Sequence, residues 1–208
     1  GLGAYPGDDN QFLGMLGMHG TYEANNAMHD CDLLINIGAR FDDRITGKID
    51  EFSPHSKKIH IDIDPSSINK IIKVDLALVG DVNDVLKAIN KTLKSKKINL
   101  KKSNKQKISK WWEQIQKWRT KNSLDFKNSD ENIKPQHAVQ RLYELTKNRD
   151  TFITTEVGQH QMWAAQHYKF NKPNRWMTSG GLGTMGYGLP AAIGVQIAHP
   201  KKLVVDIA

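Results

Sequence analysis

The hydrophobic pattern of the first half of the chain alternates between short apolar runs and longer amphipathic stretches. Each apolar run has the length of a strand and is bounded by glycine, aspartate or proline. Val82, Val85, Leu86 and Ile89 recur at helical spacing behind Asp81, a favoured residue type for a helix N-cap. Short strands separated by helices predict a parallel sheet of the α/β class. The pattern gives strands at 32–38, 57–64 and 77–81 and helices at 21–30 and 82–94.

A second α/β unit is predicted from about residue 134 onwards. Pro135 stands in the first turn of its first helix, where proline is well tolerated, and we expect Ala138, Leu142 and Leu145 to line the buried face. Pro200 closes the last helix. The pattern gives strands at 151–158, 175–181 and 202–208 and helices at 135–147, 159–168 and 187–200.

The segment between the two units has a different composition. Residues 94–110 are rich in Lys, Ser and Asn and poor in apolar residues, which predicts a solvated linker. Trp111, Ile115 and Trp118 then recur at helical spacing and predict a connector helix that lays its Trp face on a domain. The sequence therefore predicts two partial, doubly wound parallel-sheet domains, at 1–93 and 133–208, joined by a basic linker and connector helix at 94–132.

The formal charge of +8 suggests a nucleic-acid partner, but its distribution argues against one. Residues 91–122 hold twelve of the 30 Lys and Arg residues and only one of the 22 acidic residues, so the rest of the chain is nearly neutral. Binding through the lysine-rich segment would require a steep salt dependence. A single cysteine, Cys31, excludes an internal disulfide framework, so a reducing cytosol is the expected compartment. No apolar run approaches the length of a membrane span, and no membrane partner is expected.

Charged residues follow each predicted strand of the first unit. Arg40 and Arg44 follow the first strand beside two aspartates, Asp62 follows the second, and Asp81 follows the third. The carboxyl ends of parallel strands share one edge of a sheet, which is the usual ligand crevice of α/β proteins. Arginine suits phosphate or carboxylate, and an acid there can accept hydrogen bonds from ribose hydroxyls. Surface ion pairs are the competing interpretation.

The sequence SGGLGTMGYGLPAAIGV, at 179–195, contains G-x-G-x-x-G at Gly181, Gly183 and Gly186. This spacing is typical of dinucleotide-binding turns and leaves an NAD-dependent oxidoreductase open as a hypothesis, with Asp206 as the acid on the next strand. The bulky Met185 inside the loop argues against it. Close packing of the following helix would explain Gly186 and Gly188 without a phosphate.

Five segments together resemble the large, catalytic subunit of acetolactate synthase (acetohydroxyacid synthase), a thiamine-diphosphate-dependent transferase. They are LGMLGMHGTYEAN, IGARFDDRITGK, HIDIDP, VGQHQMWAAQ and MTSGGLGTMGYGLPAAIG, and the resemblance spans nearly the whole chain. The motif GARFDDRITGK favours this family over another thiamine-diphosphate carboligase or a 2-oxoacid decarboxylase.

The resemblance implies site residues in both units. Arg44 would engage the carboxylate of the second 2-oxoacid. The Gly183 carbonyl would hold the aminopyrimidine of thiamine diphosphate, Met185 would force its bent conformation, and Gln159 and His160 would lie beside it. The FAD contacts implied by the resemblance are Leu16, Gly17, Met18, His19, Gly38, Ala39, Arg40, Phe41, Asp42, Asp62, Ile63, Asp81 and Val82.

The resemblance further implies decarboxylation of pyruvate and transfer of its two-carbon unit to pyruvate or 2-oxobutyrate, in branched-chain amino acid biosynthesis. FAD would be structural, and the Mg²⁺ ligands and the activating glutamate would lie outside these 208 residues, so we expect this segment alone to be inactive. A homodimer or higher oligomer, a regulatory small subunit, and a cytoplasmic or plastid location are also expected.

Overall fold

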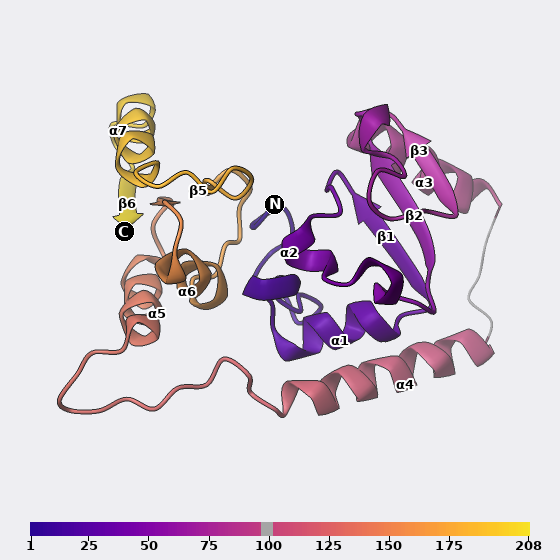
Figure 1. Cartoon of the computed structure of the whole chain (residues 1–208), viewed down its shortest axis with the longest axis horizontal. Helices are drawn as coiled ribbons and strands as arrows, with labels where there is room; N and C mark the ends of the chain where they lie inside the picture. The colour runs from indigo at the N-terminus through magenta and orange to yellow at the C-terminus, as the bar shows by residue number, and fades with distance from the viewer. Residues whose placement is uncertain (97–101) are drawn as a thin grey trace. The chain divides into compact units, whose positions relative to one another are not determined.

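The computed structural model describes residues 1–96 and 102–208, which form two compact units (Figure 1). The sheet A unit comprises residues 16–18 and 22–123, and the sheet B unit comprises residues 1–15, 19–21 and 124–208. Each unit is a parallel sheet with flanking helices, so the predicted α/β class is confirmed. The units differ from the predicted domain boundaries in that residues 1–15 pack with the C-terminal part of the chain.

Sheet A is a three-stranded parallel sheet with strand order β1-β2-β3. Each predicted strand and helix of this unit is present, with ends that differ by up to two residues. The helical elements are η1 (Gly17–His19, of which His19 belongs to the other unit), α1 (Tyr22–Asp30), α2 (Asp43–Thr46), η2 (Ile49–Glu51), η3 (Pro65–Ser67), α3 (Val82–Ser95) and α4 (Lys102–Arg119), and the strands are β1 (Leu33–Ile37), β2 (Lys57–Asp62) and β3 (Leu76–Val79).

The helix α3 begins where the sequence predicts it. The side chain of Asp81 accepts hydrogen bonds from the backbone amides of Asn83 at 2.9 Å and Asp84 at 3.3 Å, which satisfies two donors of the first turn. The four apolar residues predicted for its inner face are all partly buried. The N-cap prediction is confirmed.

The linker prediction for residues 94–110 is wrong for most of the residues that the structure describes. Lys94 and Ser95 complete α3, and α4 begins at Lys102, with residues 97–101 outside the described part of the chain. Lys, Gln and Ser are compatible with a helix, and the anchoring contacts of α4 lie further along it. Ile115 is fully buried, α4 packs along α1, and the Trp111 and Trp118 rings meet edge to face at 5.6 Å. The predicted connector helix is confirmed.

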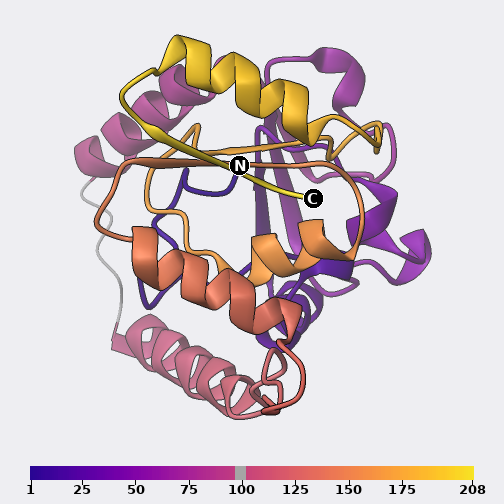
Figure 2. The same ribbon diagram turned by 90° about the vertical axis from the view of Figure 1, so that its left-hand side faces the viewer.

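Sheet B is also parallel, with strand order β5-β4-β6. Its central strand β4 is buried along its whole length. Figure 2 shows α7 on one face of this sheet and α5 and α6 on the other, as in a doubly wound fold. The elements are α5 (Pro135–Thr146), β4 (Thr151–Thr155), α6 (Gln159–His167), β5 (Trp176–Thr178), α7 (Gly188–Ala198) and β6 (Leu203–Ile207).

The buried face of α5 differs from the predicted one. Ala138 and Leu145 are exposed, whereas Val139 and Thr146 are buried and Leu142 is partly buried. Val139 joins the core of Ile153, Tyr168 and Phe170. The helix is therefore rotated toward the row 139–142–146, because the Thr146 hydroxyl bonds the Leu142 carbonyl and the Tyr168 hydroxyl and is satisfied when buried.

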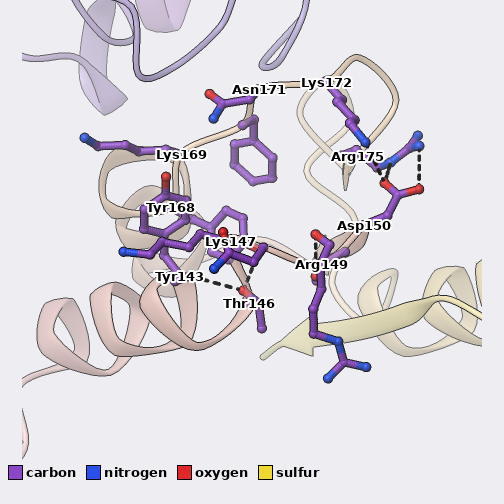
Figure 3. A pocket seen from close by; sticks show the side chains of 13 residues that line it. Tyr143, Thr146, Lys147, Arg149, Asp150, Tyr168, Lys169, Asn171, Lys172 and Arg175 are labelled. Carbon is purple, nitrogen blue, oxygen red and sulfur yellow. Dashed lines mark hydrogen bonds and ion pairs between the residues drawn. The ribbon is translucent and has the colours of Figure 1, made fainter.

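An ion-pair cluster lies at the amino-terminal edge of sheet B (Figure 3). Asp150 precedes β4 and receives two hydrogen bonds from the Arg175 guanidinium, at 2.7 and 3.2 Å. Lys202 approaches the same carboxylate at 3.0 Å and Lys172 at 3.8 Å. The hydrogen bonds from Arg175, and to a smaller extent those from Lys202, hold the pKa of Asp150 far below its usual range. The cluster therefore links residues that precede all three strands.

The rotation of α5 predicts unequal effects of two substitutions on one helix. Val139 is 5% exposed and Leu145 is 64% exposed. Val139→Ala should lower the free energy of unfolding by about 2 kcal/mol, because it leaves a cavity in the core. Leu145→Ala is the matched control and should change it by less than about 0.5 kcal/mol. Urea unfolding followed by circular dichroism measures both, and a larger effect at Leu145 would contradict the observed face.

The ion-pair cluster predicts a pH-dependent contribution to stability. Asp150→Asn should lower the free energy of unfolding by about 1–3 kcal/mol at pH 7, since it removes a charged acceptor. The folded pKa of Asp150 is depressed, so its contribution is complete above its unfolded pKa of about 4 and is lost as the pH falls below that value. The difference from wild type should therefore shrink at pH 3.

Chemical unfolding at pH 7 and pH 3 tests this expectation. Asp130→Asn, at an exposed position of the same unit, is the control and should have little effect at either pH. An equal effect of Asp150→Asn at both pH values would contradict the proposed role of its charge.

Candidate functional site

Two loops meet at the carboxyl-terminal edge of sheet B. Because β4 and β5 are parallel neighbours, the segment after Thr155 and the loop after Thr178 leave the sheet side by side. A hydrogen bond of 2.6 Å joins them, in which the Gly186 amide donates to Glu156 Oε2. The sequence predicted candidate residues in both segments, and the structure brings these segments together.

Three backbone amides of the loop at 179–187 are hydrogen-bonded within the protein. The Gly183 amide donates to the Ser179 carbonyl at 3.1 Å, and the Thr184 amide donates to the Ser179 hydroxyl at 2.8 Å. Gly183 and Gly186 have φ values of +68° and +74°, a conformation that favours glycine. The exposed surface of the loop includes Gly183 and the side chain of Met185, which is 79% exposed.

This geometry argues against the dinucleotide hypothesis. A dinucleotide turn presents backbone amides to the diphosphate, whereas the amides of Gly183, Thr184 and Gly186 already have partners inside the protein. Asp206 does not resemble a ribose acceptor, because its Oδ1 accepts the Thr154 hydroxyl at 2.7 Å.

The sequence predicts close packing of the following helix as the reason for both Gly186 and Gly188. This reason is confirmed at Gly188 and wrong at Gly186. A Cβ at Gly188 would lie 2.4 Å from Asp206 Oδ1, so α7 and β6 approach closely there. A Cβ at Gly186 would meet no atom within 4 Å. Gly186 is therefore explained by its positive φ and not by close helix packing.

Gln159 and His160 begin α6 beside this loop system. The His160 ring lies over Gly158, where a Cβ would be 2.8 Å from its Cε1 atom. The Nε2 atom of His160 is buried and has no hydrogen-bond partner within the described residues. A buried, unpartnered ring nitrogen is costly, so this atom fits a site completed by a polar ligand.

Sequence reasoning missed the polar residues behind these loops. Thr155 and Thr178 share a hydrogen bond of 2.8 Å, and Gln161 donates to the Thr178 hydroxyl at 2.7 Å. His19 belongs to this unit; burial lowers its pKa, and a side-chain hydrogen bond with Gln161 opposes that shift. The partly buried acid Glu156, placed directly after a buried strand, was the available signal for the loop contact.

The carboxyl-terminal edge of sheet A gathers nine of the predicted residues. The Gly38 amide bonds the Ile61 carbonyl at 2.8 Å, and the Gly80 amide bonds the Asp62 carbonyl at 2.9 Å, so the three strand ends are adjacent. Val82 packs against Gly38, and Ile63 is exposed. The structure brings these residues together: Gly38, Ala39, Arg40, Phe41, Asp42, Asp62, Ile63, Asp81 and Val82.

Several polar side chains at this edge also have structural partners. Arg40 pairs with Asp42 at 2.8 Å and Arg44 with Asp43 at 3.5 Å, both at the surface, as the ion-pair interpretation predicts. Asp62 accepts the Asp64 amide at 2.9 Å. Two arginines are therefore held at the strand ends by neighbouring carboxylates, with their guanidinium groups still largely exposed.

Phe41 contributes to the core and not to an open surface. Its side chain is 7% exposed and contacts the Phe52 and His60 rings edge to face, at 5.6 and 5.2 Å. The buried His60 lies 3.0 Å from the Ala39 carbonyl oxygen through Nε2, and the carbonyl accepts this hydrogen bond. Phe41 therefore fixes the loop after β1, and its backbone is the part that remains for a ligand.

Among the glycines of the sheet A unit, Gly17 lies closest to a neighbouring segment of the backbone. It has φ +73°, and a Cβ there would lie 2.2 Å from the Arg44 carbonyl oxygen. Asn25 holds it from the other side, with Oδ1 accepting the Gly17 amide at 2.7 Å. Leu16, Gly17 and Met18 are thereby placed against α2, which carries Arg44.

A hollow of about 200 Å³ lies at the opposite, amino-terminal edge of sheet B (Figure 3). Its lining includes the Asp150–Arg175 pair and the Tyr143 and Tyr168 side chains. It contains none of the predicted site residues. Within the described ranges, no three or more His, Cys, Asp or Glu side chains are grouped so that they could hold a metal ion. Among the helices described, none is long and apolar enough to cross a membrane.

Comparisons with known proteins match two parts of the chain to family models. Residues 1–89 match the thiamine pyrophosphate enzyme central domain, and residues 156–208 match the thiamine pyrophosphate enzyme C-terminal TPP binding domain. All of the chain aligns, at 48% identity, with the acetolactate synthase large subunit of Haemophilus influenzae and with the isozyme 3 large subunit of Escherichia coli, covering 35% of each.

Acetolactate synthase 1, chloroplastic, of Nicotiana tabacum is also 48% identical over 207 residues, which cover 30% of its length. The chain thus spans about a third of the length of the curated relatives it matches. It is homologous to acetolactate synthase large subunits over its whole length and matches the models of two thiamine pyrophosphate enzyme domains.

Proposed function

We propose that the whole protein is an acetolactate synthase, which decarboxylates pyruvate and joins the two-carbon unit to pyruvate or 2-oxobutyrate. The observation that carries the proposal is the loop at 179–187, in which the amides of Gly183, Thr184 and Gly186 already have partners while Gly183 and Met185 are exposed. Formation of 2-acetolactate from pyruvate, in the presence of thiamine diphosphate, Mg²⁺ and FAD, is the direct test. Absence of the product would overturn the proposal.

The sheet B unit is proposed to hold thiamine diphosphate, which would supply carbanion stabilisation when bound. The Gly183 carbonyl can accept from the aminopyrimidine, and the exposed Met185 provides an apolar surface under the cofactor. His160, with its unpartnered Nε2, and Gln159 lie at the adjacent start of α6. These residues fit the cofactor because they combine an exposed backbone acceptor, an exposed apolar side chain and a buried polar atom without a partner.

The sheet A unit is proposed to hold FAD along its carboxyl-terminal edge. Exposed Met18 and Ile63 offer apolar surface for a flavin, and the backbone of residues 38–42 offers polar groups at the strand end. Asp81 is mostly committed to capping α3, so its contribution is through the start of that helix. The flavin has no net redox role in the proposed reaction.

Arg44 is proposed to bind the carboxylate of the second 2-oxoacid. Its side chain is 66% exposed, and among the described residues its guanidinium pairs with Asp43 alone, at 3.5 Å, a weak surface pair that a bidentate carboxylate can replace. The domain assignment proposed for the chain is the later central domain at 1–93, a connector at 94–132 and the cofactor domain at 133–208.

The remaining proposals concern groups outside the chain. The Mg²⁺ ligands and the glutamate that activates the cofactor are proposed to lie elsewhere in the whole protein, so the 208 residues alone are expected to be inactive. A homodimer or larger oligomer, a regulatory small subunit and a cytoplasmic or plastid location follow from the same proposal.

Substitution of Met185 tests the thiamine diphosphate site. Met185→Ala in the whole protein should lower kcat about 10- to 100-fold, because the cofactor loses the surface that holds its reactive conformation. Leu182→Ala, on the same exposed loop, is the control and should retain activity within about threefold of wild type. Steady-state kinetics measures both, and equal kcat values for Met185→Ala and wild type would contradict the role of Met185.

Substitution of Gly17 tests the FAD site. Gly17→Ala places a Cβ 2.2 Å from the Arg44 carbonyl oxygen and should separate η1 from α2, so the purified protein should retain less flavin. Gly47→Ala is the matched control, because Gly47 also has a positive φ but no atom within 4 Å of the added Cβ. Flavin absorbance per protein measures the effect, and equal flavin content in both variants would count against the site.

A further inference from the structure

Glu156 directly follows the last residue of β4. Among the described residues between β4 and α6, its side chain alone forms a hydrogen bond with the loop after β5. Its Oε2 accepts the Gly186 amide at 2.6 Å, across thirty positions of sequence. A hydrogen bond to a charged acceptor is stronger than one between neutral groups. The contact therefore ties the loop to the central strand of sheet B.

The loop is thus held on both sides of Met185. On the N-terminal side, Ser179 accepts from the Gly183 and Thr184 amides. On the C-terminal side, Glu156 accepts from Gly186, which has a positive φ and where an added Cβ would meet no atom within 4 Å. The direction of the Met185 side chain depends on both anchors, and only the second uses a side chain from outside the loop.

We propose that Glu156 is a positioning residue that sets the place of Met185 and of the Gly183 carbonyl through the Gly186 amide. This inference rests on the proposed function, since those two groups are the proposed contacts to thiamine diphosphate. Glu156 itself does not touch the cofactor. Its negative charge also disfavours a phosphate at the loop amides, so the loop presents its carbonyl and apolar side to a ligand.

Two substitutions in the whole protein separate this role from a general effect on folding. Glu156→Ala removes the acceptor, and segment 179–187 should exchange its amide hydrogens faster in the absence of any ligand. The dissociation constant of the Glu156→Ala variant for thiamine diphosphate, measured by tryptophan fluorescence in the presence of Mg²⁺, should rise about tenfold. Glu156→Gln keeps an oxygen acceptor at the same place and should restore both values to within about threefold of wild type.

The control is Glu144→Ala, which removes a carboxylate that pairs with Lys147 on the surface of α5. It should change neither hydrogen exchange in segment 179–187 nor the dissociation constant. Faster exchange in Glu156→Ala with unchanged cofactor affinity would overturn the positioning role. Equal impairment of Glu156→Gln and Glu156→Ala would also overturn it, because the charge and not the amide contact would then matter. Failure of the wild-type protein to bind thiamine diphosphate would instead overturn the proposed function.

Discussion

Parallel pairing of neighbouring strands is the constraint on which the candidate sites depend. In a parallel sheet every strand ends at the same edge, so segments far apart in the sequence become neighbours there. In sheet A this edge gathers three segments that carry charged residues, and in sheet B it gathers the starts of two loops. The helices that return the chain on the faces of each sheet keep these edges free for loops and ligands.

The two edges of sheet B are chemically different. At the amino-terminal edge, Asp150 is paired with the three cations Arg175, Lys172 and Lys202 within the protein. At the carboxyl-terminal edge, His160 retains a buried nitrogen without a partner in the described part of the chain, and the loop leaves Met185 exposed. A stabilised edge opposite an incompletely satisfied edge is the arrangement expected when structural and ligand-binding demands are separated within one sheet.

The sequence predicted the type and order of the strands and most of the helices, because apolar periodicity and capping residues are local signals. Asp81 and Pro135 both occupy the predicted positions at helix starts. The face of α5 was mispredicted because the choice between Leu145 and Thr146 depends on the hydroxyl partner that Tyr168 provides across the core. The lysine-rich start of α4 was mispredicted because its stability comes from contacts of Ile115 and α1 further along.

The glycine-rich loop shows a similar limit for the candidate site. Its glycine spacing is compatible with two opposite orientations of the backbone, with amides toward a ligand or amides toward the protein. Only the partners of those amides distinguish the two, and Glu156 and Ser179 were not identifiable as partners without the strand order. The resemblance of five segments to acetolactate synthase supplied what spacing alone did not.

The charge cluster at the start of sheet B has a consequence for how its strands align. Asp150, Arg175 and Lys202 each stand immediately before a strand, and a helix separates each of the three strands from the next along the chain. Sliding one strand past its neighbour by a single residue would move these charges apart by about 3.3 Å and turn its inward side chains to the opposite face. The cluster therefore stabilises one register of the three strands relative to registers shifted by a single residue.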